Sequence, residues 1–436
     1  MKRRHLKMRQ YASMTQTGQG THLRTGTSET MHAEGLVCPR TTISGILVLA
    51  MFLCIFAPGT GFAQESWVGA SGAWNTRTNW SPQTVPTSGS SVIFGSAGTA
   101  DVTFSGASNA SSITFVAGAK AFTIGNTIST NTLTLSNGGT VQIANTVTNG
   151  ETIAERIALG GASYTFANND TTTTGTLDFT GRITGDSAAA STLTLTGVAG
   201  SGTNIISGSM RNGTGAGGVA RVLSLSVAGG NWSLMSTGNT YTGATTVAGG
   251  QLILGASGAL GSGSSAISLK GGTMLLNASS AISGTTNNVT MNGGTLALKS
   301  SAASFSESLG TLTLSSNSTI DFANATGSTI RFSALAGTPS GTLTVDNWST
   351  SDTFAFSGTG NGLATFAANN VRFDIAGIGD VGGNVVNLGG GEYAIMAAIP
   401  EPRTVVAGVA LLAFIFWKER RRIVGLASLL KRPLAS

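Results

Sequence analysis

A repeat with a fixed step of 22 residues constrains the fold of this chain more than any other feature. The segment GGQLIL at 249–254 returns as GGTMLL at 271–276 and as GGTLAL at 293–298. A period in the low twenties with two short apolar segments per unit is typical of a solenoid, in which successive coils stack on one another. Each unit can bury its apolar face only against its neighbours, so stability increases with the number of coils.

The repeat also predicts which residues face the interior of each coil. Alternate apolar residues are expected to point inward, while the intervening Thr and Ser point out. The Gly-Gly pair between the two segments permits positive φ, so the chain can turn a corner there. Leu252, Met274 and Leu296 occupy matching positions, so we expect them to stack as one interior ladder. A leucine-rich repeat has a similar period, but the sequence lacks its Asn/Cys ladder and its helical half-repeat.

Period-two alternation of Leu, Val, Ile and Thr continues well beyond the repeat. It is clearest at 132–135, 192–195, 223–227, 311–314 and 342–345. Alternating runs between Gly, Asn and Ser clusters predict short β-strands between turns, and a disordered chain lacks such runs. We therefore expect an all-β fold with up to about fifteen coils, and fewer where the pattern is irregular.

The distribution of histidine and cysteine excludes several kinds of chemistry. His5, His22, His32, Cys38 and Cys54 all lie before residue 64. The rest of the chain therefore has no disulfide, no thiolate nucleophile, and no imidazole for a Ser-His-Asp triad, a zinc site or a haem. We predict no catalytic, cofactor-binding or metal-binding residues and no cofactor.

The formal net charge of +6 does not describe the body of the chain. Seven Lys/Arg lie in 1–63 and another seven in 403–436, which leaves 10 basic against 15 acidic residues between 64 and 402. Positive charge that flanks apolar runs orients those runs in a membrane. The basic residues therefore do not indicate nucleic acid, and we expect no nucleic-acid partner.

The beginning of the chain has the pattern of a secretory signal peptide. An apolar run at 43–57 follows Arg40, Pro58 breaks it, and small residues precede a cleavage position after Ala63. We expect a signal helix, export by the Sec machinery and cleavage after Ala63. The alternatives are a permanent membrane helix, for which the run is short, and a lipoprotein, for which the residues after Cys54 fit poorly.

The end of the chain has three successive parts. A helix-breaking motif is followed by an apolar run at 404–417 and then by a basic stop. The motif is Pro400, Glu401 and Pro402, and the basic stop is Lys418, Arg420, Arg421 and Arg422. A tail of this kind holds a protein in the membrane while a processing enzyme acts beside it, so we expect a C-terminal hydrophobic helix and transient attachment to the inner membrane. A helix buried in the body is the alternative.

The order and residues of this tail resemble the PEP-CTERM sorting signal of bacterial surface proteins. The resemblance implies that an exosortase-type enzyme recognises Pro400, Glu401 and Pro402 and trims the tail. The segment 423–436 departs from the pattern, because such tails usually end near the basic stop.

A second resemblance concerns the repeat itself. Residues 239–255 (NTYTGATTVAGGQLILG), followed by ALG at 259–261, are similar to the autotransporter-associated β-strand repeat. The resemblance implies a right-handed, single-stranded parallel β-helix of the kind found in secreted passenger regions. The stretch containing Trp67, Trp74 and Trp80 resembles the opening of many tail-bearing proteins. We interpret these tryptophans as a cap over the open end of the solenoid, with a sugar-stacking platform as the alternative.

These observations predict six segments. They are a signal region (1–63), an N-terminal cap (64–100), β-helix repeats (101–345, clearest at 239–300), a C-terminal β cap or spacer (346–399), the sorting signal (400–422) and a short tail (423–436).

Two functions from different classes fit the sequence. The first is a non-catalytic cell-surface or extracellular-matrix solenoid that contacts exopolysaccharide or neighbouring cells. The second is a β-helical polysaccharide lyase or hydrolase, which would need clustered carboxylates together with Arg or Lys. The candidates for that second function are Asp170, Asp178 and Asp186 with Arg156, Arg182 and Arg211, although no strand carries paired carboxylates. We favour the first function.

Overall fold

The computed structural model describes residues 63–420, apart from short gaps at 128–129, 187, 199, 201, 261–265, 283–286, 300–303, 324–325, 359–361, 376–377 and 400–407. All of these residues belong to one compact unit, Gly61–Ser436. The predicted signal helix therefore lies outside the described residues.

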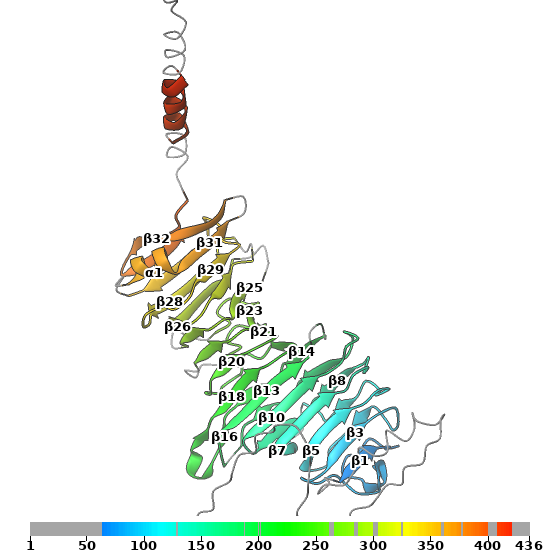
Figure 1. Ribbon diagram of the computed structural model, residues 1–436. Helices are drawn as coiled ribbons and strands as arrows, with labels where there is room; N and C mark the ends of the chain where they lie inside the picture. Colours follow the sequence, from blue (N-terminus) through cyan, green and yellow to red (C-terminus); the bar gives the residue numbers. More distant parts are fainter. Residues whose placement is uncertain are drawn as a thin grey trace, which may run out of the picture. The chain divides into compact units, whose positions relative to one another are not determined.

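Two long series of parallel strands form the body, and in Figure 1 the sequence colours follow their stacking. The strands of the first face pair in the order β1 (Gln64–Trp67), β3 (Ser91–Phe94), β5 (Ser108–Phe115), β7 (Thr132–Ile143), β10 (Ser163–Asn168), β13 (Ser191–Gly197), β18 (Leu223–Val227), β20 (Thr245–Val247), β22 (Ile267–Leu269), β24 (Val289–Met291), β26 (Ser306–Leu314), β28 (Thr329–Leu335) and β30 (Thr353–Ser357).

The second face contains the other long series. It consists of β4 (Asp101–Val102), β6 (Thr123–Ile124), β8 (Gly150–Ile153), β11 (Thr176–Phe179), β14 (Thr203–Ile206), β19 (Asn231–Leu234), β21 (Gln251–Leu254), β23 (Thr273–Leu276), β25 (Thr295–Leu298), β27 (Ser318–Asp321), β29 (Leu343–Asp346) and β31 (Val371–Ile375).

A short third face occurs in the N-terminal half. The first part of β7 pairs with β9 (Arg156–Gly160), which pairs with β12 (Ile183–Thr184), and β12 pairs with β15 (Met210–Arg211). A small hairpin follows, formed by β16 (Gly213–Thr214) and β17 (Ala220–Arg221), with the short 3-10 helix η2 (Ala216–Gly218) between them.

The structure confirms the parallel β-solenoid and the alignment of the repeat. Leu252 pairs with Met274 and Met274 with Leu296, and all three side chains are buried. Along β20 to β25, inward apolar residues alternate with residues that are mostly less buried Thr, Ser and Gln, as a solenoid coil requires. The apolar exceptions among these alternating positions are Ile253, Leu275 and Ala297. One coil in this region therefore takes 22 residues.

The number of coils is smaller than expected. The solenoid has about eleven turns instead of up to about fifteen. Several coils outside 239–300 are longer: Tyr164 pairs with Leu193, and Leu193 pairs with Leu225. Loops of varying length use residues that a strict 22-residue step would have placed in additional coils.

Glycine allows close approach at the corner between the second and third faces. Gly181 follows β11, and Gly208 occupies the equivalent position after β14, where its N–H donates to the carbonyl oxygen of Phe179 at 3.0 Å. A Cβ atom at Gly208 would overlap the carbonyl oxygen of Gly181, and one at Gly181 would overlap that of Glu155. Successive coils can therefore stack here only while both positions lack a side chain.

The first coil is filled by the three predicted tryptophans. Trp67, Trp74 and Trp80 are at most 1% exposed, and the Trp80 ring packs edge-on against the other two at 4.8–4.9 Å. The 3-10 helix η1 (Arg77–Asn79) leads into β2 (Trp80–Ser81), which runs antiparallel to β1. This burial fits the cap and leaves no free ring face for a sugar.

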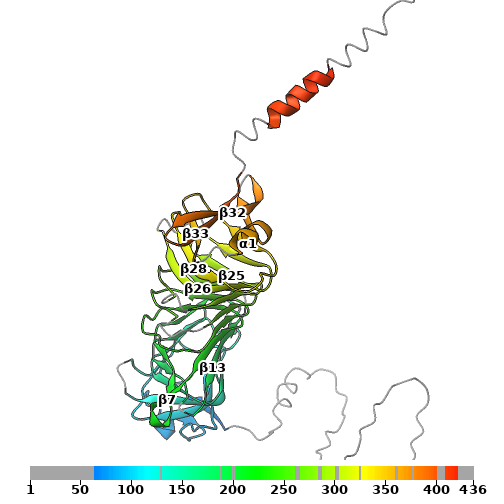
Figure 2. The same cartoon turned by 90° about the vertical axis from the view of Figure 1, so that its left-hand side faces the viewer.

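The last coils are covered by elements of a different kind. The helix α1 (Leu363–Asn369) packs near β31 and β32 (Gly379–Gly389), and Figure 2 shows α1 and β32 together with β33 (Glu392–Ala397). The strands β32 and β33 run antiparallel to β31 and β30 respectively. The C-terminal region thus contains a helix as well as the expected β structure.

Residues 408–420 form a helix whose side chains are exposed throughout, with Phe416 75% exposed. This exposure does not support a helix buried in the body. Among the described residues, no helix combines the length and apolar character needed to cross a bilayer.

Candidate functional site

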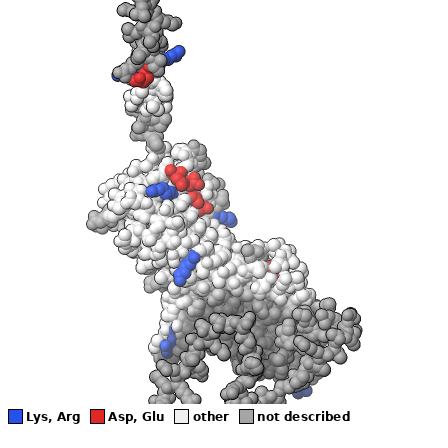
Figure 3. Space-filling view, viewed as in Figure 1, with Lys and Arg blue, Asp and Glu red and all other residues white. Residues whose placement is uncertain are grey.

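Aspartates from successive coils line up at the C-terminal end of the second face. Asp321 ends β27 and pairs with Asp346 at the end of β29, which pairs with Asp374 near the end of β31. Asp380 on β32 pairs with Asp374 from the antiparallel side. We call these four residues the aspartate column, and in Figure 3 acidic side chains gather in one area of the C-terminal coils.

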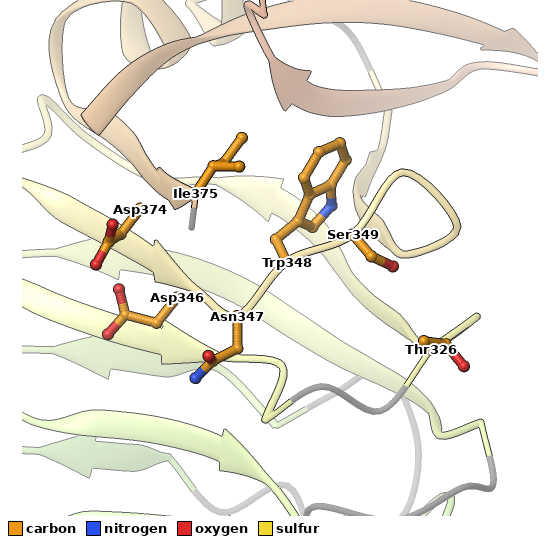
Figure 4. A pocket seen from close by; sticks show the side chains of 7 residues that line it. All are labelled: Thr326, Asp346, Asn347, Trp348, Ser349, Asp374 and Ile375. Atoms are coloured by element: carbon orange, nitrogen blue, oxygen red, sulfur yellow. The ribbon is translucent and has the colours of Figure 1, made fainter. Parts of the chain in front are cut away.

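A pocket of about 370 Å³ lies beside this column (Figure 4). Asp346 and Asp374 line it together with Asn347, Trp348, Ser349, Thr326 and Ile375. Figure 4 shows the two carboxylates side by side on neighbouring strands, with Trp348 on the following segment of chain. The volume lies within the range of small-molecule sites.

Local hydrogen bonds hold the turn that follows β29. The Asn347 side-chain amide donates to Asp321 Oδ1 at 2.8 Å, and the Ala323 N–H donates to the same oxygen at 2.7 Å. Asn347 has φ of +53°, a left-handed conformation that Asn tolerates better than most residues. Asp321 is thus occupied by internal donors, which leaves Asp346 and Asp374 as the carboxylates that face the pocket.

The apolar wall of the pocket is continuous with the core. Trp348 is 7% exposed and packs edge-on against Phe373 with ring centroids 5.0 Å apart. Its indole N–H is buried and has no acceptor among the described residues. Trp348 therefore contributes mainly packing, and its position is fixed by the coil beneath it.

Electrostatic repulsion acts on the central carboxylate of the column. Partial burial, followed by the charges of Asp321, Asp374 and Asp380, raises the pKa of Asp346. A carboxyl group with a raised pKa beside a second carboxyl group is the arrangement that general acid–base chemistry uses. Within the described residues, no group of three or more His, Cys, Asp or Glu side chains is placed to hold a metal ion.

We expect Asp346→Asn to stabilise the protein slightly at about pH 8 and to have no such effect at about pH 3. A raised folded-state pKa means that the stabilisation is present at low pH and is lost as the pH rises through that pKa. Because Asp346 is partly exposed, the expected gain is about 0.5 kcal/mol. Urea unfolding at the two pH values measures it, with Asp101→Asn on β4 as the control; an equal gain in both variants would contradict the prediction.

The three aspartates predicted from the sequence do not come together. Asp170 is buried in a turn and accepts N–H bonds from Thr172 and Gly175 at 2.9 Å. Burial raises its pKa, but these hydrogen bonds outweigh that effect and the pKa is lowered. Asp178 lies on the second face, where burial raises its pKa, whereas Asp186 follows β12 and accepts N–H bonds from Ala188 and Ala189.

The three predicted arginines, in contrast, lie on adjacent coils. Arg156 begins β9, Arg182 directly precedes β12 and Arg211 ends β15, so all three belong to the third face. They lie on different coils from the aspartate column. The structure therefore does not assemble the predicted carboxylates and arginines into one site.

Few of the predicted sorting residues lie in the described part of the chain. Lys418 and Arg420 are exposed on the helix at 408–420. Ala63 is exposed, and its carbonyl oxygen accepts the N–H of Ser91 at 2.7 Å. Pro400, Glu401, Pro402, Arg421 and Arg422 lie outside the described residues.

The aspartate column does not follow from the sequence of any single strand, because each strand carries only one of its carboxylates. The available signal was a shared strand ending: Ile320-Asp321, Val345-Asp346 and Phe373-Asp374 each place an Asp after an inward apolar residue. Equivalent positions of stacked coils lie side by side, so the shared ending was enough to bring these carboxylates together.

Comparisons with known proteins add no further assignment. No family model, no curated protein and no solved structure matches this chain.

Proposed function

We propose that this chain is an exported, non-catalytic protein of the cell surface or extracellular matrix, which contacts exopolysaccharide or neighbouring cells. The observation that carries the proposal is the solenoid itself. Its outward positions along β20 to β25 are mostly Thr, Ser and Gln that repeat from coil to coil, apart from one apolar row formed by Ile253, Leu275 and Ala297. A repetitive polar surface suits many weak contacts with a polymer, and such contacts reinforce one another.

The proposed route rests on the two ends of the chain. Export by the Sec machinery would precede cleavage after Ala63, and the apolar run at 404–417 would hold the protein transiently at the inner membrane. An exosortase-type enzyme would then act near Pro400 to Pro402. A right-handed, single-stranded coil, as in autotransporter passengers, is part of the same proposal.

Cell fractionation with mass spectrometry of both termini tests this route. We expect a mature protein that begins at Gln64, ends near residue 402 and is found in the outer envelope or the matrix. Replacing Pro400, Glu401 and Pro402 together by Ala should leave the tail uncut and the protein in the inner membrane, whereas Ala at Lys120, Lys270 and Lys299 should not. A wild-type protein that keeps its tail and stays in the inner membrane would contradict the proposal.

The aspartate column favours a second candidate, a β-helical glycan hydrolase. Asp346 and Asp374 line one pocket, and two carboxyl groups on either side of a glycosidic bond can act as acid and base. Incubation of the protein with neutral and acidic oligosaccharides, followed by analysis of reducing ends, tests this candidate. Cleavage that disappears in the Asp346→Asn and Asp374→Asn variants would favour the hydrolase over the non-catalytic role.

A further inference from the structure

Three positively charged side chains form a column on the third face. We call this column the arginine ladder. It consists of Arg156, Arg182 and Arg211. These residues alternate with buried apolar neighbours, and their own side chains are half-buried or exposed. The ladder therefore faces outward from three successive coils.

The strand register brings the three guanidinium groups close together. Because β12 pairs in parallel with both β9 and β15, Arg182 lies beside Arg156 on one coil and beside Ser209 on the next. Arg211 lies two residues further along its strand, but its Nε donates to Ser209 Oγ at 3.2 Å. That hydrogen bond turns the Arg211 side chain back toward the position next to Arg182.

The ion pair seen among the described residues does not involve the ladder. It joins Arg331 to Glu392, in the C-terminal coils. The Nε of Arg182 is buried and has no acceptor among the described residues. Burial, and then the charges of Arg156 and Arg211, lower the pKa of Arg182, which shows that the three charges act on one another.

Two acidic side chains close to the ladder in sequence accept hydrogen bonds from backbone N–H groups. Glu155, next to Arg156 in the chain, is fully buried, and its Oε1 accepts the Arg156 backbone N–H at 3.2 Å. The Asp186 carboxylate caps the backbone N–H groups of Ala188 and Ala189. Three guanidinium groups on adjacent coils can bind an anion from outside the chain, and its charge would relieve their mutual repulsion.

The ladder also has a defined spacing. Neighbouring strands in a sheet are about 4.8 Å apart, so the guanidinium groups follow the stacking direction at intervals of this order. Each guanidinium can bind a carboxylate through two parallel hydrogen bonds. A polymer with carboxylates at regular intervals can therefore contact several coils at once, and a small anion cannot.

We propose that the arginine ladder binds an acidic polysaccharide through its uronate carboxylates, with the polymer running along the direction in which the coils stack. This proposal rests on the proposed function, because an exported protein meets such a polymer at the cell surface. Beyond the proposed function, it specifies that the glycan is acidic and that the three arginines recognise it. The rest of the body is acidic and repels the same polymer, so binding is confined to the ladder.

The test is a binding measurement with the purified full chain in mild detergent and immobilised polygalacturonate as the probe. We expect the wild type to bind in low-salt buffer and to be released as salt increases. The triple variant Arg156→Gln, Arg182→Gln, Arg211→Gln should bind at least about tenfold more weakly. The single variant Arg182→Lys keeps the charge but loses the planar fork, so it should show a smaller loss.

The control removes three positive charges from residues outside the ladder. Lys120→Gln, Lys270→Gln and Lys299→Gln together should leave binding within about twofold of wild type, and circular dichroism should show that every variant keeps its β structure. Equal weakening in the lysine variant, no binding by wild type, or equally tight and ladder-dependent binding of double-stranded DNA would each overturn the proposal. The fractionation experiment tests the proposed export route independently of this binding measurement.

Discussion

A Gly208→Ala substitution is expected to lower the free energy of unfolding by about 3 kcal/mol, although it adds only one methyl group. The new Cβ would overlap the carbonyl oxygen of Gly181 on the neighbouring coil. That oxygen belongs to backbone, which cannot move away as the end of a flexible side chain can. The coils would have to separate at this corner, which would disturb the hydrogen bond from the Gly208 N–H to Phe179.

Urea unfolding followed by circular dichroism measures this effect, and Gly106→Ala is the matched control. Gly106 has nothing within 4 Å of the position that its Cβ would take. The control should change stability by less than about 0.5 kcal/mol. A similar small change at Gly208 would mean that the coils do not approach each other as closely as described here.

A Glu151→Gln substitution is expected to stabilise the protein at about pH 8 and to flatten the dependence of its stability on pH. Glu151 is fully buried at the start of the second face, and burial raises its pKa from 4.5 to about 8. Its Oε2 accepts the Phe122 N–H at 2.9 Å, which opposes that shift, while Oε1 has no partner among the described residues. Gln keeps the acceptor for Phe122 and removes the ionisable group.

The direction follows from which state binds the proton more tightly. The folded state holds the Glu151 proton up to about pH 8, whereas the unfolded state releases it near 4.5. Stability from this group is therefore complete below about pH 4.5 and is lost between there and about pH 8. The difference corresponds to a free energy on the order of 5 kcal/mol.

The test is to measure the free energy of unfolding across this pH range for the wild type and for Glu151→Gln. The wild type should lose stability toward about pH 8, and the variant should lose less of it. Burial also raises the pKa of Glu307 to about 8, so the variant keeps part of the slope. Parallel curves for the two proteins would show that Glu151 does not titrate in this range.

The core of the repeat could be predicted from the sequence because two regularities coincide there. Side chains alternate with period two, and the step between coils stays at 22 residues, so the pairing of Leu252, Met274 and Leu296 follows directly. The burial of Trp67, Trp74 and Trp80 in the first coil agrees with the interpretation of these residues as a cap.

The number of coils and the aspartate column could not be predicted in the same way. From β10 to β18 the loops change in length, so the number of residues between paired strands is not constant. The register of these strands therefore could not be predicted from a fixed repeat. Asp321, Asp346 and Asp374 are likewise separated by unequal intervals. The arginines were identified, but that Arg211 turns back to Ser209 could be seen only from the side-chain hydrogen bond.

The antiparallel strands at the two ends have a consequence for assembly. On the first face, β2 pairs with β1 at one end and β33 pairs with β30 at the other, each against the direction of the stack. A second copy arriving at these places meets a reversed strand and cannot continue the parallel register. Copies of the protein should therefore not add end to end as the protein concentration rises. We expect single units of constant length in place of fibres.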